Sequence, residues 1–295
     1  MRALALQGVA TSRRWLVVSR LWEILPGLAA WIFLLSPLIL SWFEPMWVAY
    51  LIIGYDLLWL SRSFGMSYRL VRGYGRLRRT MRADWQHRLE DLEDIPAAIE
   101  RVTKRLQHEI MTRAKRLELK RYLRYLKQQV KEGREILKPS ELYQAVLVTT
   151  YNETLETLEP TIQSVVDSHY NHKRIWLIIA YEERGGEATQ RNAEKLIKRY
   201  GRHFGHAEAI KHPANLPGEA VAKAGNINFA ARRLTKQVRS EGIDPAHVLV
   251  TTLDADNRPA PQYFAHLSFI YATTPNRTHK SYQPIPMFLN NIWDA

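Results

Sequence analysis

The stretch that decides the fold is Val248–Pro259, VLVTTLDADNRP, an apolar run that stops abruptly at two acidic residues. Its first part is rich in β-branched residues, as buried strands are. Asp254 and Asp256 follow, separated by one alanine. In an extended segment, side chains two residues apart point the same way, so both carboxylates could face one ligand. Taken by itself, the pair is explained more simply as a turn at the end of a strand.

Three similar apolar runs precede this one, and segments of helical character separate them. The expected strands are Tyr143–Thr150 (YQAVLVTT), Arg174–Tyr181, His206–Pro213 and His247–Leu253, and the expected helices are Leu155–Ser168, Ala188–Tyr200 and Glu219–Arg239. Strands that alternate with helices indicate an α/β domain with a mostly parallel sheet. Such sheets bind ligands beyond the carboxyl ends of their strands, so the loops that follow the strands are the predicted site.

Acidic or amide side chains open three of those loops. They are Asn152 and Glu153, then Glu182 and Glu183, then Asp254 and Asp256. Two carboxylates at close range repel each other unless a cation lies between them. Oxygen ligands suit Mg²⁺ or Mn²⁺, and a phosphate can complete the coordination. The convergence therefore predicts a divalent-metal site at Asp254 and Asp256.

A second candidate feature is Ala222–Asn228, AKAGNIN. Lys223 is a candidate phosphate contact, and Gly225 would let a ligand approach the backbone closely. Asn228 adds an amide that can donate and accept hydrogen bonds. By spacing alone, the ordinary start of a helix is a slightly better explanation of the same residues.

The amino-terminal part is apolar. Ile24–Phe43 contains 20 residues without a charge, about the length that crosses a bilayer. A buried helix of a soluble protein is the alternative. Met46–Leu60 predicts a second span that continues to about Met66, and the acidic Asp56 inside it is either a functional or helix-contact residue or a solvated one.

The chain of 295 residues carries a net charge of +13 and no cysteine, which excludes disulfides, thiolate metal sites and cysteine nucleophiles. Seven arginines and no acid lie between Arg62 and Arg82. Basic residues on both sides of the apolar pair place both ends in the cytoplasm, in a multi-pass protein of the plasma (inner) membrane. The arginine run suits anionic lipid headgroups, so membrane lipids are expected partners and nucleic acid is not.

Residues 84–137 are highly charged and predict one or two amphipathic helices with solvated charges. Apolar residues recur there at helical spacing: Leu89, Leu92, Ile95, Ile99, and again Leu117, Tyr122, Leu126. The expected organisation is a cytoplasmic segment (1–23), two transmembrane helices (24–66), a basic helical linker (67–140) and an α/β domain (141–295).

The strings VLVTTYNE, AKAGNIN and VTTLDADNRP, in this order, resemble the membrane-integrated family 2 glycosyltransferases with the GT-A (Rossmann-like) fold. The cellulose synthase and hyaluronan synthase group is closely related. The resemblance covers roughly Tyr143 to the end of the chain. Ser281–Pro284, SYQP, is a looser match to a strand on the acceptor side of such enzymes.

The resemblance implies an inverting transfer of a sugar from a nucleoside diphosphate sugar, UDP-linked by expectation, to a glycan or lipid-linked acceptor. The implied donor contacts are Asn152, Glu153, Glu182 (or Glu183), Lys223, Asn228 and Asp254. Asp256, with Asp254, would hold the Mg²⁺ or Mn²⁺ that stabilises the departing diphosphate.

The chain departs from the family pattern near its end. The later acidic motif that supplies the general base, and the QxxRW motif, do not occur in this sequence, and Asp294 gives no basis for that role. The expectation is an amino-terminal portion of a longer enzyme, with the base beyond Ala295. The rival interpretations are a membrane-anchored nucleotide-binding or scaffold protein without transferase activity, and a basic nucleic-acid binder.

Overall fold

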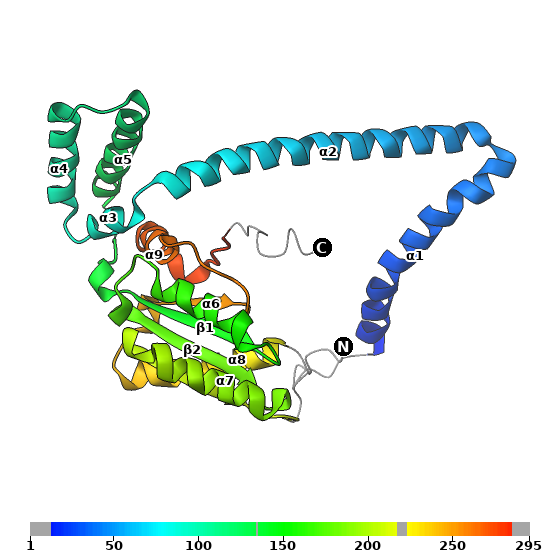
Figure 1. The fold of residues 1–295 in the computed structure, drawn as a ribbon. Coiled ribbons are helices and arrows are strands. Elements are labelled where there is room, and N and C mark those ends of the chain that lie inside the picture. Colours follow the sequence, from blue (N-terminus) through cyan, green and yellow to red (C-terminus); the bar gives the residue numbers. More distant parts are fainter. Residues whose placement is uncertain (1–12, 134, 217–222, 285–295) are drawn as a thin grey trace. The chain divides into compact units, whose positions relative to one another are not determined.

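The computed structural model describes residues 13–133, 135–216 and 223–284 (Figure 1). Contacts divide the chain into two compact units, with the boundary between Arg79 and Thr80. Each unit is described by itself below.

The first unit consists of two long helices. Helix α1 spans Arg13–Phe43, and α2 begins at Pro45 and ends at Arg82. The part of α1 from Val17 to Phe43 is long and apolar enough to cross a membrane, and it is the one segment of the described chain that meets this test. The second predicted span lies within α2, where Asp56 and the following arginines lower the apolar character.

The second unit is built on a four-stranded sheet that is parallel throughout. Its strands are β1 (Tyr143–Thr150), β2 (Ile175–Glu182), β3 (His206–His212) and β4 (Val248–Leu253), in the spatial order β3-β2-β1-β4. The α/β class and the parallel sheet predicted from the sequence are therefore confirmed. The four strand ranges agree with the predicted ones to within one residue. The central strands β1 and β2 are runs of buried residues, and the edge strands β3 and β4 are only partly buried.

Helices cover both faces of this sheet (Figure 1). Helices α6 (Leu155–Val166) and α7 (Gly186–Tyr200) pack with one set of strand residues, which includes Val146 and Ile179. Helix α8 (Lys223–Ser240) packs with the opposite set, which includes Leu147 and Ile178. The part of the predicted helix before Lys223 lies outside the described residues. The alternation of the two sets along each strand follows from the two-residue period of a strand.

A third core lies among helices. Helices α3 (Trp85–Glu90), α4 (Ile95–His108) and α5 (Arg113–Lys131) pack in one cluster that includes residues of α9 (Tyr263–Thr273). The amphipathic helices predicted here are present. Of the apolar residues noted for their helical spacing, Leu117 is half exposed, and Leu119 is buried in its place. The helical face is set by Tyr122 and Leu126, and Leu119 falls on that face while Leu117 does not.

Candidate functional site

The strand order defines where a ligand would bind. Strands β1, β2 and β3 succeed one another in one direction, and β4 then returns to the other side of β1. In an open parallel sheet, the crevice at this switch point, beyond the carboxyl ends of the strands, is the usual ligand site. The loop after β1 and the loop after β4 flank it. These loops carry the predicted residues Asn152, Glu153, Asp254 and Asp256.

The two aspartates after β4 lie in a turn. The backbone N–H of Asn257 donates to the carbonyl oxygen of Asp254 at 3.1 Å, so the segment is not extended, as the sequence argument assumed. Both aspartates are nevertheless exposed, and Ala255 between them is buried. The buried hydroxyl of Thr161 on α6 donates to the Ala255 carbonyl at 2.7 Å. This hydrogen bond attaches the turn to α6, while both aspartate side chains are exposed to solvent.

Lys223 and Asp254 form an ion pair, although they are 31 positions apart in the sequence. Lys223 is the first described residue of α8, and Asp254 follows β4, so the crossover from α8 to β4 brings them together. Both side chains are about half exposed (51% and 56%), so the pair contributes little to stability. The Lys223 ammonium and the Asp254 carboxylate therefore remain accessible to a ligand at the switch point.

Glu153 organises the loop after β1. Its Oε2 accepts hydrogen bonds from the Thr150 hydroxyl and the Tyr151 backbone N–H, both at 2.7 Å, and from the Asn152 N–H at 3.2 Å. Burial opposes ionisation of this carboxyl, but these donors outweigh burial and lower its pKa. The structure therefore gives Glu153 a role in fixing the loop, and Asn152 is exposed on that loop.

The two glutamates after β2 differ in their surroundings. Glu182 is buried and pairs with Arg184, whose guanidinium lies 5.7 Å from the centre of the Tyr151 ring. Glu183 points instead to the end of β3. It accepts hydrogen bonds from the Ala214 N–H at 3.0 Å and from the Lys211 ammonium at 3.2 Å, and both lower the pKa of Glu183. Of the two, Glu182 is the one that contributes to the edge near the loop after β1.

The two asparagines of AKAGNIN also differ. Asn226 is buried, and its Nδ2 donates to the Ala180 carbonyl of β2 at 2.8 Å, which attaches α8 to the sheet. Asn228 is exposed on α8. The interpretation of this segment as the start of a helix is therefore correct, and the helix also delivers Lys223 to the switch point.

Three residues of the edge were not identified from the sequence: Arg184, Gly185 and Thr189. The Thr189 hydroxyl lies 2.9 Å from the Tyr151 carbonyl oxygen and 2.9 Å from that of Gly185, so it joins the loop after β1 to α7. A Cβ at position 185 would lie 1.8 Å from the Tyr151 oxygen, so only glycine fits there. The Arg184-Gly-Gly string was the available signal, because glycines after a strand often mark close backbone approach.

The donor set fits a divalent cation that also binds a ligand. Among the residues that the structure describes, no three His, Asp or Glu side chains gather closely enough to hold a metal by themselves. Asp254 and Asp256 supply two exposed carboxylates. Mg²⁺ commonly binds through one or two carboxylates and takes its other ligands from substrate phosphates and water.

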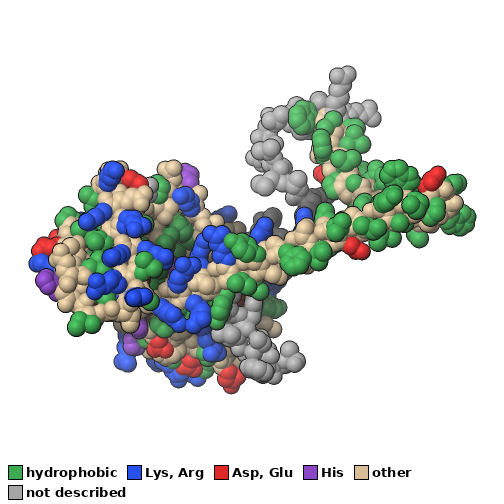
Figure 2. Space-filling model, turned by 90° about the horizontal axis from the view of Figure 1, so that it is seen from above, with side chains coloured by type: hydrophobic (Ala, Val, Ile, Leu, Met, Phe, Trp, Pro, Cys, Tyr) green, Lys and Arg blue, Asp and Glu red, His purple; other side chains and the backbone are tan. Residues whose placement is uncertain are grey.

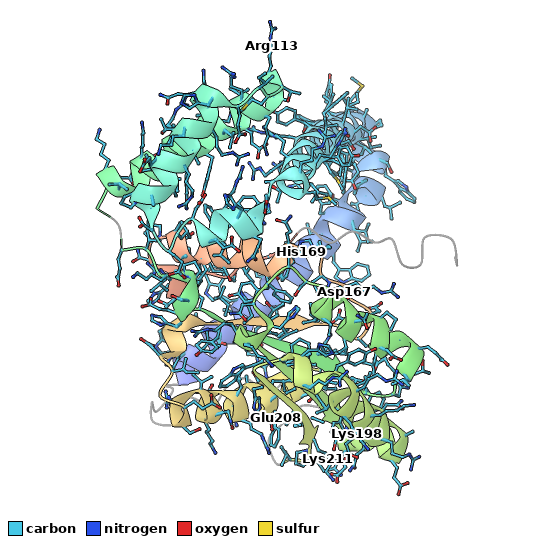
Figure 3. All side chains as sticks on the ribbon, turned by 60° about the vertical axis from the view of Figure 1, so that its left-hand side comes forward. Arg113, Asp167, His169, Lys198, Glu208 and Lys211 are labelled. Carbon is cyan, nitrogen blue, oxygen red and sulfur yellow. The ribbon has the colours of Figure 1, made fainter. Side chains whose placement is uncertain are left out.

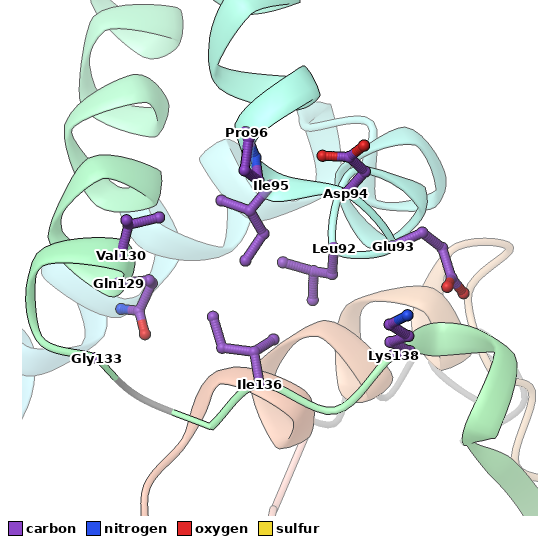
Figure 4. A pocket seen from close by; sticks show the side chains of 10 residues that line it. All are labelled: Leu92, Glu93, Asp94, Ile95, Pro96, Gln129, Val130, Gly133, Ile136 and Lys138. Carbon is purple, nitrogen blue, oxygen red and sulfur yellow. The ribbon is translucent and has the colours of Figure 1, made fainter.

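Two features of the sequence remain, and the structure adds a pocket. Ser281–Pro284 forms no strand, and Tyr282 packs against Tyr271 at a ring distance of 5.9 Å. Asp294 lies outside the described residues. A pocket of about 370 Å³ lies between the start of α4 with the turn before it and the end of α5 with the segment after it, lined in part by Leu92, Gln129 and Ile136 (Figure 4). No predicted site residue lines this pocket.

Comparison with known proteins finds similar solved structures and no sequence family. No family model and no curated protein matches the chain. The mannosyltransferase PcManGT from Pyrobaculum calidifontis, in complex with GDP-Man and Mn²⁺, matches with 17% sequence identity and a TM-score of 0.31. The match covers 61% of this chain and 44% of that chain, so the chain spans less than half of that protein's length. Similarity at this level identifies no family for the chain.

Proposed function

We propose that the chain acts as a membrane-bound glycosyltransferase of the GT-A type. It would take a sugar from a nucleoside diphosphate sugar, with UDP as the proposed nucleotide, and transfer it with inversion to a polysaccharide or lipid-linked acceptor. The observation that carries the proposal is the contact between Lys223 and Asp254 at the switch point. Two of the three strings that resemble family 2 glycosyltransferases, AKAGNIN and VTTLDADNRP, therefore meet at the sheet edge where a nucleotide ligand is expected.

A diphosphate needs positive charge, and this edge supplies it. The Lys223 ammonium is half exposed, so it can leave Asp254 for a phosphate at small cost. Asp254 would then accept hydrogen bonds from the donor or share the metal. Glu182 and the loop that Glu153 fixes would border the nucleoside, and Asn152 and Asn228 supply exposed amides for further donor contacts.

Asp256 and Asp254 are the residues that would hold Mg²⁺ or Mn²⁺. When bound, the cation supplies a charge that neutralises the departing nucleoside diphosphate. The Thr161 hydroxyl fixes the backbone of the turn between the two aspartates, so this backbone does not have to be ordered when the donor binds.

The membrane part of the proposal rests on α1, which is long and apolar enough to cross a bilayer. We propose that the first half of α2 crosses back, with Glu44 and Pro45 outside and the α/β domain in the cytoplasm. The excess of arginine after Leu60 supports this orientation. No residue is proposed as the general base.

Titration calorimetry with UDP- and GDP-linked sugars, with and without Mn²⁺, tests the donor site. Asp256→Ala should weaken donor binding in Mn²⁺ by about tenfold or more, the value of one charge-assisted contact, and should remove the effect of the metal. Asp167→Ala is the matched control, because Asp167 is an exposed acid at the end of α6. If Asp256→Ala leaves the affinity and the metal dependence unchanged, the site is wrongly assigned.

Mass spectrometry of the same samples separates the enzyme from a protein that only binds nucleotides. A transferase converts the donor in the presence of acceptor glycans or lipids and releases nucleoside diphosphate. A binding or scaffold protein would show the same calorimetric signal and leave the donor intact.

A further inference from the structure

Helix α5 carries a stripe of basic side chains along one face, which we call the basic stripe. It consists of Arg113, Arg116, Lys120, Arg124, Lys127 and Lys131, all exposed. Their spacing of three or four residues places them on one side of a helix, over a length of about 27 Å. The buried residues of α5, such as Tyr122 and Leu126, lie on the opposite side. The side chains of the basic stripe therefore do not pack into the core.

The basic stripe is not neutralised within the unit. Among the described residues, no acidic side chain forms an ion pair with any of its six members. Glu118 is the only acid of α5, and it pairs with Arg88 at 2.6 Å and with Lys115 at 3.6 Å. Six adjacent like charges repel one another, so the stripe is favourable mainly when an anionic partner lies against it.

Apolar side chains lie beside the stripe. Ile110, in the turn between α4 and α5, is fully exposed, and Leu117 on α5 is half exposed. Figure 3 shows Arg113, at the start of α5, pointing away from the protein beside this turn. Figure 2 shows many Lys and Arg side chains on one face of the second unit, with apolar side chains among them. A cationic helix face with exposed apolar residues is typical of segments that bind a membrane surface.

We propose that the α4–α5 hairpin docks on an anionic phospholipid surface, with the basic stripe against the headgroups and Ile110 inserted between them. The choice of lipid over nucleic acid rests on Ile110, because a phosphate backbone offers an isoleucine no apolar partner. Each Lys or Arg near an anionic membrane contributes about a fivefold gain in binding. The inference rests in part on the proposed anchoring by α1, which would hold the hairpin at a high effective concentration of headgroups.

Because the sequence contains no cysteine, a fluorophore can be attached to one introduced cysteine alone. The full chain carrying Ile110→Cys, labelled with an environment-sensitive fluorophore, is reconstituted in nanodiscs of phosphatidylcholine alone or with phosphatidylglycerol. Some discs also contain nitroxide-labelled lipid, which quenches only a fluorophore that enters the bilayer. Ser240→Cys, exposed at the end of α8, is the control label position.

Two variants with fewer positive charges test whether the position of the charge matters. One replaces Lys120, Arg124, Lys127 and Lys131 of the stripe by Gln. The matched control replaces four exposed basic residues of α7 and α8 by Gln: Lys195, Lys198, Arg232 and Lys236. The two variants lose the same charge, so only the position of the charge differs.

The label at position 110 should shift to the blue and be quenched in discs with phosphatidylglycerol, and not in phosphatidylcholine alone. The stripe variant should lose this response, the control variant should keep it, and about 0.5 M salt should abolish it. An equal response in both lipids, an equal loss in both variants, or a response to added DNA duplex instead of lipid would overturn the proposal.

Failure of the anchor is distinguishable from failure of the hairpin. If carbonate extracts the chain from the discs, anchoring by α1 is refuted. Vesicles of the same two compositions are then added from outside, and the label at position 110 still decides whether the hairpin binds anionic lipid.

Discussion

Substitution of Gly185 by alanine should disturb the candidate site through the loop after β1. The added Cβ would lie 1.8 Å from the Tyr151 carbonyl oxygen and 2.7 Å from the Thr189 hydroxyl. Both distances are far below van der Waals contact. The Tyr151 oxygen belongs to the backbone and cannot rotate away, so the loop or the start of α7 has to move by more than 1 Å, on the order of the overlap.

The cost follows from the contacts that this movement breaks. Overpacking at a fixed site costs about 1–3 kcal/mol. Loss of the Thr189 hydrogen bond to Tyr151 adds about 0.5–1.5 kcal/mol. We expect Gly185→Ala to lower the free energy of unfolding by about 2–4 kcal/mol, which corresponds to a fall in Tm of roughly 4–16 °C for a unit of this size.

Gly205→Ala is the matched control. Its Cβ would lie 2.1 Å from the Lys173 carbonyl oxygen, a similar backbone clash. Gly205 directly precedes β3, at the amino ends of the strands and thus at the opposite edge of the sheet. Both variants are measured by thermal and urea unfolding, and their binding of nucleoside diphosphates by calorimetry.

We expect both variants to lose stability and only Gly185→Ala to lose nucleotide affinity as well. Unchanged stability in Gly185→Ala would refute the steric argument. An equal loss of affinity in Gly205→Ala would show that general destabilisation, and not the position of the Tyr151 loop, controls binding.

Two further predictions concern charges in the second unit. Lys223→Gln should change the free energy of unfolding by less than about 1 kcal/mol, because the ion pair with Asp254 is half exposed. The same substitution should weaken nucleoside diphosphate binding by about tenfold or more. A large fall in Tm with unchanged affinity would contradict this prediction. Burial and the charge of Arg88 lower the pKa of His266 from 6.5 to about 4, so between these pH values the unfolded chain binds a proton that the folded chain does not. Stability should therefore rise with pH across this window. His266→Phe, which keeps an aromatic ring against Trp85, should flatten the rise by on the order of 3 kcal/mol in urea unfolding. An unchanged pH profile in this variant would contradict the prediction.

Much of the α/β domain follows from the sequence because its signals are local. The run Tyr143–Thr150 predicts β1 with the bounds that the structure has, since a strand buried on both faces needs a continuous apolar, β-branched segment. Alternation of such runs with helical segments is enough to predict a parallel sheet, and parallel strands place their carboxyl ends at one edge. Asn152, Glu182 and Asp254 could therefore be assigned to that edge from their positions alone.

The tertiary structure decided what depends on contacts between distant segments. Strand order placed β4 beside β1, and this put the Asp254 turn and the Tyr151 loop on the two sides of the switch point. The same packing brought Lys223 to Asp254 and Thr161 to the Ala255 carbonyl. Glu153 closes its own loop, and the aspartate pair lies in a turn instead of an extended segment. A sequence pattern indicates which face of an element is apolar. Strand order and crossover packing decide which polar groups of two elements meet, and both exist only in the folded chain.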